Sequence, residues 1–354
     1  MLNDKEKKRY NRHLILDSVG EKGQKKLKAA KVLVVGAGGL GCPILQYLTA
    51  AGVGKIGIVD NDKIDYSNLQ RQVLYATEDI GKSKAEIAAS KLAKQNDFVD
   101  FEVFNCRLTN QNALEIFQPY DIIVDGTDNF TTRYLINDAC VLLNKPLVYG
   151  AIFKFEGQVS VFNYKNGPTY RCVFPEPPEP GSSPSCSEIG VIGVLPGLIG
   201  TMQANEVIKV TLGFEGTLSG RLLLVNAKSM DFNEISINRN MSIKALSEKE
   251  YKNFDYAYFC GIPESENVVL NDLNIHETFF LDVREEFEAP RLDTANLIEI
   301  PLNELKMRLN ELDNTKEMVV VCQGGVRSLK AIEILKSEGF TKLKNLKGGV
   351  IANF

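Results

Sequence analysis

The chain lacks the features that mark membrane, secreted and nucleic-acid-binding proteins. None of its apolar runs approaches the roughly 18 residues that a helix needs to span a bilayer, so we expect no membrane partner. Its charged N-terminus has no apolar segment of the kind that a secretory signal needs. The net charge of −4 and the lack of a long basic block give no reason to expect nucleic acid as a partner.

A disulfide framework and tryptophan are also missing. The chain has no Trp, and its seven cysteines are odd in number and scattered. Without an export signal, such cysteines indicate reduced thiols, some of them reactive, rather than a set of disulfides. We therefore expect a cytoplasmic protein.

The overall composition is typical of a globular protein. Apolar residues make up 44% of the chain and charged residues 24%, which are ordinary values. A length of 354 residues predicts two or three domains.

Strands and helices alternate through the first part of the chain. Apolar runs and helical spacing predict strands at 32–35, 55–59, 101–106 and 145–151, a strand and turn at 121–129, and helices at 9–30, 41–51 and 82–95. This alternation predicts an α/β fold with a parallel, doubly wound sheet that binds ligands at the carboxyl ends of its strands. Residues 156–165 alternate in a manner suited to antiparallel pairing, a later helix runs into Gly213, and residues 220–237 are expected as two more strands.

The second half of the chain predicts a further, smaller domain. Residues 175–185 are rich in Pro, Gly and Ser, which is typical of an exposed loop. The pattern loosens between about 238 and 272, and a new α/β pattern follows. We expect a first domain at 1–240, a linker at 241–274 and a small α/β domain at 275–354, since about 80 residues are enough for one.

A glycine-rich turn follows the first strand. Gly36, Gly38 and Gly41 have G-x-G-x-x-G spacing, and Asp60 follows Gly41 by 19 positions. Such a loop offers backbone N–H groups and a helix N-terminus to a phosphate, while Asp60 suits the ribose of NAD or ATP equally. The extra glycine, Gly39, fits close approach of the backbone to a nucleotide. A tight turn without a ligand is the other interpretation.

Charged residues near this loop favour ATP over NAD. Arg71, Lys84 and Asp128 follow in "SNLQRQ", "GKSKAE" and "DGTDN". Cations can neutralise charge that develops on phosphates, and a carboxylate can hold Mg²⁺. Hydride transfer uses none of these groups, so an NAD-dependent oxidoreductase explains them less well. Taken singly, Arg71 and Lys84 could be ordinary surface charges.

Residues 9 to 237 closely resemble the adenylating enzymes of the MoeB/ThiF group, relatives of ubiquitin-activating enzymes. The matching stretches include "RYNRHLIL", the glycine loop, "SNLQRQ", "GKSKAE", "DGTDN" and "PSCSEIGVIGVLPGLIG". The resemblance implies a Rossmann-like domain that binds ATP, with Arg71 and Lys84 acting on the phosphates and Asp128 linked to Mg²⁺. The implied nucleotide site comprises Gly36, Gly38, Gly39, Gly41, Asp60, Ser67, Asn68, Arg71, Gln72, Lys84, Asp128 and Asn129.

The resemblance also implies a reaction and partners. The C-terminal glycine of a small ubiquitin-like sulfur carrier ending in Gly-Gly attacks the α-phosphate of ATP and forms an acyl-adenylate. Arg12 is implied to reach the ATP site of a second subunit, which makes the protein a homodimer.

Cys186 lies directly after the Pro-rich loop. A helix starting there would favour its thiolate, and a buried structural thiol is the alternative from the residues alone. The resemblance places the family's acceptor cysteine here. Whether it forms a thioester or an acyl-disulfide stays open.

Cys322 opens "CQGGVRS" after the apolar strand 318–321. A loop of this kind can aim backbone N–H groups at one sulfur, with Arg327 nearby. Residues 275 to 354 resemble rhodanese sulfurtransferases, which implies that Cys322 carries a persulfide. The implied sulfur loop comprises Cys322, Gly324, Gly325, Arg327 and Ser328. A docking module without catalysis is the alternative.

A structural zinc site that many relatives have is incomplete here. Such sites use paired C-x-x-C motifs. Thr169 stands where the first cysteine belongs, Cys172 is left alone, and "NRNMSIKAL" supplies no second pair. We expect ATP and Mg²⁺, and no zinc.

The carrier and the sulfur source are not specified by the residues. Molybdopterin-type and thiamin-type carriers both end in Gly-Gly, and the fused rhodanese domain favours the molybdopterin type. The upstream sulfur donor is expected to be of the cysteine desulfurase type. A carrier-docking scaffold without catalysis is a further alternative, against which the intact cysteines and cations speak.

Overall fold

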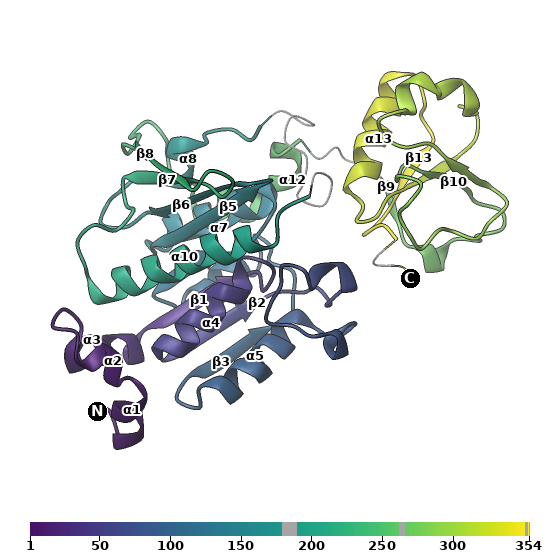
Figure 1. The fold of residues 1–354 in the computed structure, drawn as a ribbon. Helices are drawn as coiled ribbons and strands as arrows, with labels where there is room; N and C mark the ends of the chain where they lie inside the picture. Colours follow the sequence, from purple (N-terminus) through teal and green to yellow (C-terminus); the bar gives the residue numbers. More distant parts are fainter. Residues whose placement is uncertain (179–189, 262–265, 351–352, 354) are drawn as a thin grey trace. The chain divides into compact units, whose positions relative to one another are not determined.

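The chain forms two compact units that divide between Tyr256 and Ala257. The computed structural model describes residues 1–178, 190–261, 266–350 and 353 (Figure 1). Each unit contains one β-sheet, with eight strands in the first and five in the second. The predicted α/β fold with a second, smaller α/β domain is confirmed.

The sheet of the first unit has the strand order β3-β2-β1-β4-β5-β6-β7-β8. Its first five strands run parallel and the last three antiparallel. Strand order therefore reverses between β1 and β4, which puts a crevice at the carboxyl ends of these two strands. The strands are β1 (Lys31–Val35), β2 (Lys55–Val59), β3 (Asp100–Phe104), β4 (Ile122–Asp125), β5 (Leu147–Phe153), β6 (Glu156–Phe162), β7 (Arg221–Asn226) and β8 (Asp231–Ser236).

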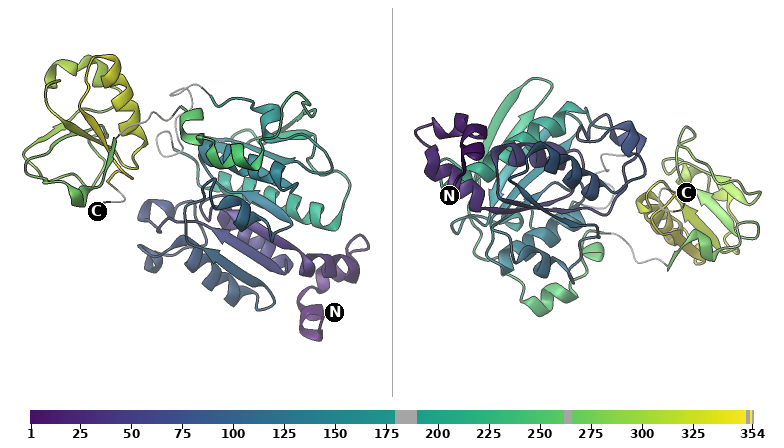
Figure 2. Two further views of the ribbon diagram at one scale, coloured as in Figure 1. Left: turned by 180° about the vertical axis from the view of Figure 1, so that it is seen from behind. Right: turned by 90° about the horizontal axis from the view of Figure 1, so that it is seen from below.

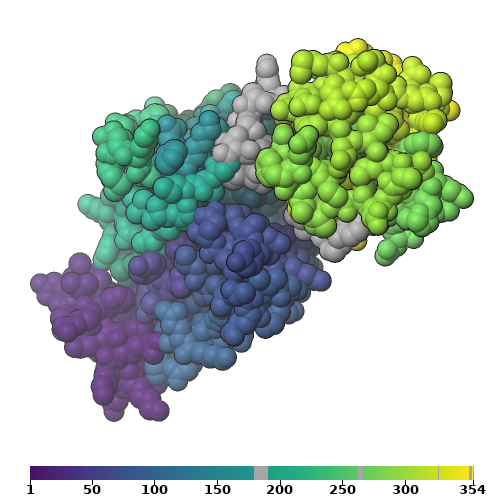
Figure 3. Space-filling view, turned by 45° about the vertical axis from the view of Figure 1, so that its right-hand side comes forward, coloured from purple at the N-terminus to yellow at the C-terminus, as the bar shows by residue number. Residues whose placement is uncertain are grey.

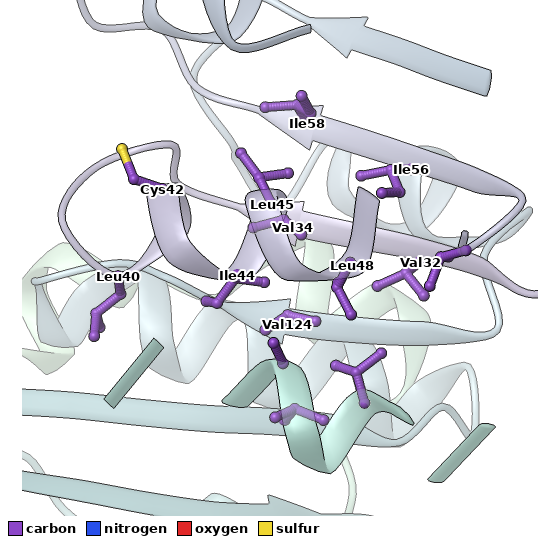
Figure 4. Close-up of a cluster of buried hydrophobic side chains, with 14 of the residues drawn as sticks. Val32, Val34, Leu40, Cys42, Ile44, Leu45, Leu48, Ile56, Ile58 and Val124 are labelled. Atoms are coloured by element: carbon purple, nitrogen blue, oxygen red, sulfur yellow. The ribbon is translucent and has the colours of Figure 1, made fainter. Parts of the chain in front are cut away.

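Helices cover both faces of this sheet (Figures 1 and 2). One face carries α4 (Gly41–Ala51), α5 (Lys84–Gln95) and α10 (Val194–Leu212), and the other carries α6 (Ala113–Phe117) and α7 (Phe130–Leu142). Ile44, Leu45 and Leu48 of α4 point into the layer above β1, β2 and β4 (Figure 4). All three are fully buried, so this layer is held by close apolar packing.

The N-terminal helices lie at the amino edge of the sheet. They are α1 (Asp4–Arg9), α2 (Asn11–Leu14) and α3 (Gly20–Ala29). Asn96, just after α5, donates to the hydroxyl of Tyr10 at 2.9 Å, and Gln24 donates to the carbonyl of Ala51 at 2.9 Å. In the surface view, the purple N-terminal residues accordingly lie against blue residues of the first unit (Figure 3). The expected single helix at 9–30 is thus broken into short helices.

A buried carboxylate fixes the last part of the first unit. Asp138 of α7 accepts two hydrogen bonds from Arg171, at 2.8 and 2.7 Å, and one from Tyr256, at 2.8 Å. These contacts attach α8 (Tyr170–Val173) and the chain after α11 (Glu248–Asn253) to α7. A short helix, α12 (Tyr256–Phe259), follows. The helix α7 itself was not predicted.

The second unit has a sheet that is parallel throughout. Its order is β11-β10-β12-β13-β9, and α13 (Val326–Ser337) packs on β12 and β13. The strands are β9 (Glu266–Val268), β10 (Phe279–Asp282), β11 (Leu297–Glu299), β12 (Met318–Val321) and β13 (Leu343–Leu346). β9 lies within the stretch assigned to the linker, because three residues are too few to show a period. The boundaries 240 and 274 stay predictions.

The helices of the described ranges offer no membrane span. None is both long and apolar enough to cross a bilayer.

We predict that Leu92→Ala destabilises the first unit far more than Lys94→Ala. Leu92 and Lys94 both belong to α5. Leu92 is fully buried, whereas Lys94 is exposed. Loss of a buried leucine leaves a cavity and costs about 2–5 kcal/mol of unfolding free energy, while an exposed substitution changes it by about 0.5 kcal/mol or less. Urea unfolding followed by circular dichroism measures both. Equal effects would contradict the packing of α5.

Candidate functional site

Three glycines make close backbone contact where β1 and β4 end. A Cβ on Gly41 would lie 2.0 Å from the carbonyl oxygen of Gly36, and one on Gly36 would lie 2.8 Å from that of Gly126. Gly36 also has a φ of +93°, which side chains disfavour. The glycine turn is thus pressed against the turn after β4, and both border the crevice between the two strands.

Asp60 holds the glycine turn from the end of β2. Its carboxylate accepts hydrogen bonds from the backbone N–H of Ala37 at 2.7 Å and of Asp62 at 2.8 Å. Burial raises the pKa of Asp60, although the charge of Lys84 and the hydrogen bond from Ala37 oppose the shift. Tyr75 supports the same turn by donating its hydroxyl to the carbonyl of Ala37 at 2.7 Å.

The two predicted cations lie in different settings. Lys84 begins α5, is only 6% exposed, and pairs with Asp62 at 2.8 Å. Arg71 donates to the carbonyl of Ser67 at 3.0 Å, and its Cγ lies 3.7 Å from where a Cβ on Gly39 would be. The structure therefore brings both cations to the glycine turn.

Gln72 lies under the glycine turn and leaves one polar atom unused. Its Nε2 lies 3.6 Å from where a Cβ on Gly38 would be, and the residue is 3% exposed. Within the described ranges, its buried Oε1 has no hydrogen-bond partner. Buried polar atoms are normally paired, so this oxygen is available to a ligand.

Ser67 and Asn68 form a short turn before Arg71. Asp65 caps this turn, η1 (Tyr66–Asn68), by accepting from the backbone N–H and the hydroxyl of Ser67, while Asn68 accepts from the backbone N–H of Asp65 at 3.2 Å. The side chains predicted to touch nucleotide here also define the turn.

Asp128 and Asn129 follow β4 at the crevice. Both are exposed, and Asn129 caps α7 by accepting from the backbone N–H of Thr132 at 2.9 Å. In the described part of the chain, no hydrogen bond or ion pair engages the carboxylate of Asp128. An exposed carboxylate at the nucleotide crevice is a suitable oxygen ligand for Mg²⁺.

Two buried residues, Asp125 and Arg133, hold the turn that follows β4. Asp125 accepts from the backbone N–H of Thr127 at 2.9 Å and from its hydroxyl at 2.6 Å. Burial raises the pKa of Asp125, while the Arg133 guanidinium 3.9 Å away acts in the opposite direction. Arg133 also donates to the carbonyl of Thr127 at 3.1 Å. Neither residue was predicted from the sequence, although Asp125 stands in "DGTDN".

Arg12 is not brought to this crevice within one chain. It is exposed on α2, next to His13, which hydrogen-bonds Gln24 at 2.8 Å. α2 lies at the amino edge of the sheet, whereas the glycine turn lies at the carboxyl edge. Within one chain, the position of α2 therefore keeps Arg12 away from the glycine turn.

Cys186 lies outside the described residues. Cys172, the remnant of the expected zinc cysteines, accepts hydrogen bonds at 3.3 Å from the backbone N–H groups of Thr169 and Asn240. Burial opposes ionisation of Cys172, but these hydrogen bonds and the Thr169 hydroxyl lower its pKa. Among the described residues, no group of three or more His, Cys, Asp or Glu side chains could hold a metal ion.

Cys322 begins the turn after β12 in the second unit. The residue is 1% exposed, and its sulfur accepts from the backbone N–H of Gly325 at 3.1 Å and lies 3.3 Å from the hydroxyl of Ser328. Gly349 supports the turn, since a Cβ there would lie 2.3 Å from the Cys322 carbonyl oxygen. Gly324 is exposed. The loop thus presents an N–H group and a hydroxyl to the sulfur.

The arginines near the Cys322 loop form ion pairs with acidic side chains. Arg327 pairs with Glu288 through two contacts of 2.6 Å. Arg284 is fully buried, pairs with Asp282 at 2.7 Å and donates to the side chain of Gln323 at 2.9 Å. Glu288 and Arg284 lie in "FLDVREEFE", where spacing alone gave no sign of these contacts.

Two protein families match the chain. Residues 10–245 match the ThiF family, and residues 256–352 match the rhodanese-like domain.

Curated relatives cover one or both of these regions. A sulfur carrier protein adenylyltransferase of Thermus thermophilus is 51% identical, covering 72% of this chain and 96% of its own. A probable molybdopterin-synthase adenylyltransferase of Porphyra purpurea is 45% identical, covering 97% and 91%. A probable adenylyltransferase/sulfurtransferase MoeZ of Mycobacterium tuberculosis is 41% identical, covering 99% and 93%.

Solved structures share the fold of the first unit. Escherichia coli MccB, crystallised with ATP, is similar with a TM-score of 0.60 and 23% identity, covering 69% of this chain and 75% of its own. At that identity the likeness shows the fold alone.

We predict that Glu288→Gln removes an acid-sensitive part of the stability of the second unit. Burial disfavours the charged form of Glu288, but hydrogen bonds from Arg327 and the Glu285 backbone lower its pKa overall. A lowered pKa stabilises the fold above the carboxyl's ordinary pKa, and this stability is lost as pH falls through the lowered pKa. Unfolding midpoints of the wild type and the variant should therefore differ at pH 7 and converge in acid.

The matched control is Glu286→Gln, because Glu286 is exposed and lies two positions before Glu288. It should change stability by about 0.5 kcal/mol or less. A difference for Glu288→Gln that stays constant with pH would contradict the role of the ion pair.

Proposed function

Because this chain belongs to the ThiF family and carries a rhodanese-like domain, it is an adenylyltransferase and sulfurtransferase, and we propose how its residues divide the reaction. Its substrate is a small ubiquitin-like sulfur carrier that ends in Gly-Gly. The observation that carries the proposal is the crevice between β1 and β4, where a glycine turn, two cations and an exposed carboxylate meet.

The first step is adenylation in this crevice. A carboxylate oxygen of the carrier attacks the α-phosphorus of ATP, an O–P bond forms, and the bond to the bridging oxygen breaks to release pyrophosphate. The N–H groups of the glycine turn face the phosphates, and Asp60 accepts from the ribose hydroxyls. Arg71 and Lys84 neutralise charge that develops on the phosphates.

Magnesium fits the carboxylate that the crevice offers. Asp128 is exposed beside the glycine turn, whereas Asp125 is occupied by Thr127. Asp128 would hold the ion, which would neutralise phosphate charge when bound.

Arg12 is assigned to the active site of a second copy. In one chain it lies on α2, at the opposite edge of the sheet from the glycine turn, so a homodimer is the arrangement in which it contributes to the reaction.

The second step transfers sulfur. The terminal sulfur of a Cys322 persulfide attacks the acyl carbon of the adenylate, a C–S bond forms, and AMP leaves. The product is an acyl disulfide between the carrier and Cys322. A thiolate of a dithiol reductant then attacks the Cys322 sulfur and releases the carrier thiocarboxylate. The second thiolate of the reductant breaks the resulting mixed disulfide and frees Cys322, and a cysteine desulfurase supplies new persulfide sulfur. Cys186 is assigned the acceptor role toward the carrier that the resemblance implies.

The carrier is assigned to the molybdopterin-synthase type, and the compartment to the cytoplasm. Support for this carrier comes from the Porphyra purpurea relative, which matches nearly the whole chain and is named as a molybdopterin-synthase adenylyltransferase.

We predict ATP–pyrophosphate exchange that depends on the carrier. Carriers of the molybdopterin and thiamin types from the same organism should be compared side by side, and the molybdopterin type should give the larger kcat/KM. Exchange with the thiamin type alone would reverse the carrier assignment. Exchange with neither, together with binding of NADH, would contradict adenylation by this crevice.

We also predict that the two chemical steps separate by mutation. Cys322→Ala should keep pyrophosphate exchange and lose thiocarboxylate formation, because its sulfur takes no part in adenylation. Arg71→Ala should lower exchange by about 10²–10³-fold, the usual effect of removing one charge-stabilising group, and keep persulfide formation on Cys322. Mass spectrometry of the carrier measures both products. Loss of exchange in a folded Cys322→Ala variant would contradict the division of labour.

A further inference from the structure

The guanidinium of Arg133 is buried next to the turn that carries Asp128. Arg133 lies in α7 and is 7% exposed. Its Nη2 atom donates to the carbonyl of Thr127 at 3.1 Å, and its Nε atom lies 3.9 Å from the carboxylate of Asp125. Long side chains of a helix point back toward its N-terminus, so this arginine reaches the turn that precedes its own helix.

The hydrogen bond from Arg133 fixes the peptide group that leads into Asp128. The carbonyl of Thr127 and the N–H group of Asp128 belong to the same planar unit. Asp125 also holds Thr127, because it accepts from the backbone N–H and the hydroxyl of that residue. Asn129, which follows Asp128, caps α7. Hydrogen bonds therefore fix the backbone on both sides of Asp128, whose own carboxylate stays exposed.

The buried charge of Arg133 is poorly arranged for stability alone. A guanidinium loses hydration energy on burial and recovers it only when its N–H groups are well paired. At 3.9 Å, Nε of Arg133 is too far from Asp125 for a hydrogen bond. Among the described residues, this buried atom has no hydrogen-bond partner. An apolar side chain would pack here at a lower cost, which points to a role for the arginine in the turn that it holds.

We propose that Arg133 is a positioning residue for adenylation, which holds the Asp128 turn so that the carboxylate of Asp128 faces the Mg²⁺ that accompanies ATP. A carboxylate whose backbone is already fixed loses little conformational freedom when it binds an ion. Arg133 thus acts through Asp128 and not on the phosphates. The inference rests on the proposed function, in which Asp128 is the ligand of magnesium.

Arg133→Lys tests this proposal, because lysine keeps the positive charge but lacks the planar fork of N–H groups. Isothermal titration calorimetry of the full chain, without carrier, gives the Kd of ATP with Mg²⁺ and with EDTA. The ratio of the two values is the gain in affinity that Mg²⁺ provides. We expect Arg133→Lys to reduce this gain about 10-fold and to leave the Kd in EDTA within about twofold of the wild-type value.

A second variant, Thr127→Val, tests the same turn from a half-buried position. It removes the hydroxyl from which Asp125 accepts and keeps a side chain of similar shape. We expect it to reduce the gain from Mg²⁺ about threefold, the usual effect of one lost hydrogen bond. The matched control is Thr127→Ser, which keeps the hydroxyl and should keep the gain. Thermal unfolding of each variant shows that it is folded at the temperature of the titration.

Combining Arg133→Lys with Asp128→Asn shows whether the arginine acts through the carboxylate. Asp128→Asn alone should remove most of the gain from Mg²⁺, because it removes the charged ligand. In that background, Arg133→Lys should reduce the gain no further, since the effects of two residues that act through one group do not add.

Three results would overturn the proposal. An unchanged gain from Mg²⁺ in both Arg133→Lys and Thr127→Val, with a reduced gain in Asp128→Asn, rejects the positioning role and keeps Asp128 as the ligand. Equal weakening of ATP binding with Mg²⁺ and with EDTA shows that Arg133 only supports the fold of the crevice. A full gain in Asp128→Asn contradicts the proposed function at this carboxylate, and the inference falls with it.

Discussion

Close approach of glycine backbones at the ends of β1 and β4 is the constraint on which the larger unit depends. The carbonyl of Gly36 leaves no room for a side chain on Gly41, and that of Gly126 leaves none on Gly36. This contact joins the turn that begins α4 to the turn that leads into α7. It thereby sets the N–H groups of one turn beside the exposed carboxylate of the other, Asp128, in a crevice that strand order creates.

The smaller unit applies the same kind of constraint to a sulfur atom. Gly349 lies against the turn that follows Cys322, and Gly325 supplies the N–H group that reaches the sulfur. The nearby Arg284 and Arg327 form ion pairs with Asp282 and Glu288, so their positive charges are neutralised locally. What distinguishes the site is therefore the pair of polar groups close to the sulfur, the N–H group of Gly325 and the hydroxyl of Ser328.

Much of the fold followed from local patterns. Apolar runs predicted β1 and β2, and helical spacing predicted α5, because these elements face one apolar layer with a regular period. The helix α7 escaped prediction, and β9 is too short to show a period. Two contacts that were missed share one cause: Glu288 pairs with Arg327, and Arg284 reaches Gln323 as well as the nearby Asp282. Glu288–Arg327 and Arg284–Gln323 each join residues 39 positions apart, and no spacing rule reveals such contacts.

The sequence by itself determined the type of each site. Glycine spacing, Asp60 and the order of cations predicted a nucleotide crevice, and Cys322 in its loop predicted a sulfur site, because these chemistries need particular residues close together in the chain. Only the tertiary structure decided which charges are free. It paired Lys84 with Asp62 and Arg327 with Glu288, left Asp128 exposed, and put Arg12 at the opposite edge of the sheet. The physical reason is that charge pairing and burial depend on distances between segments, which strand order and packing set.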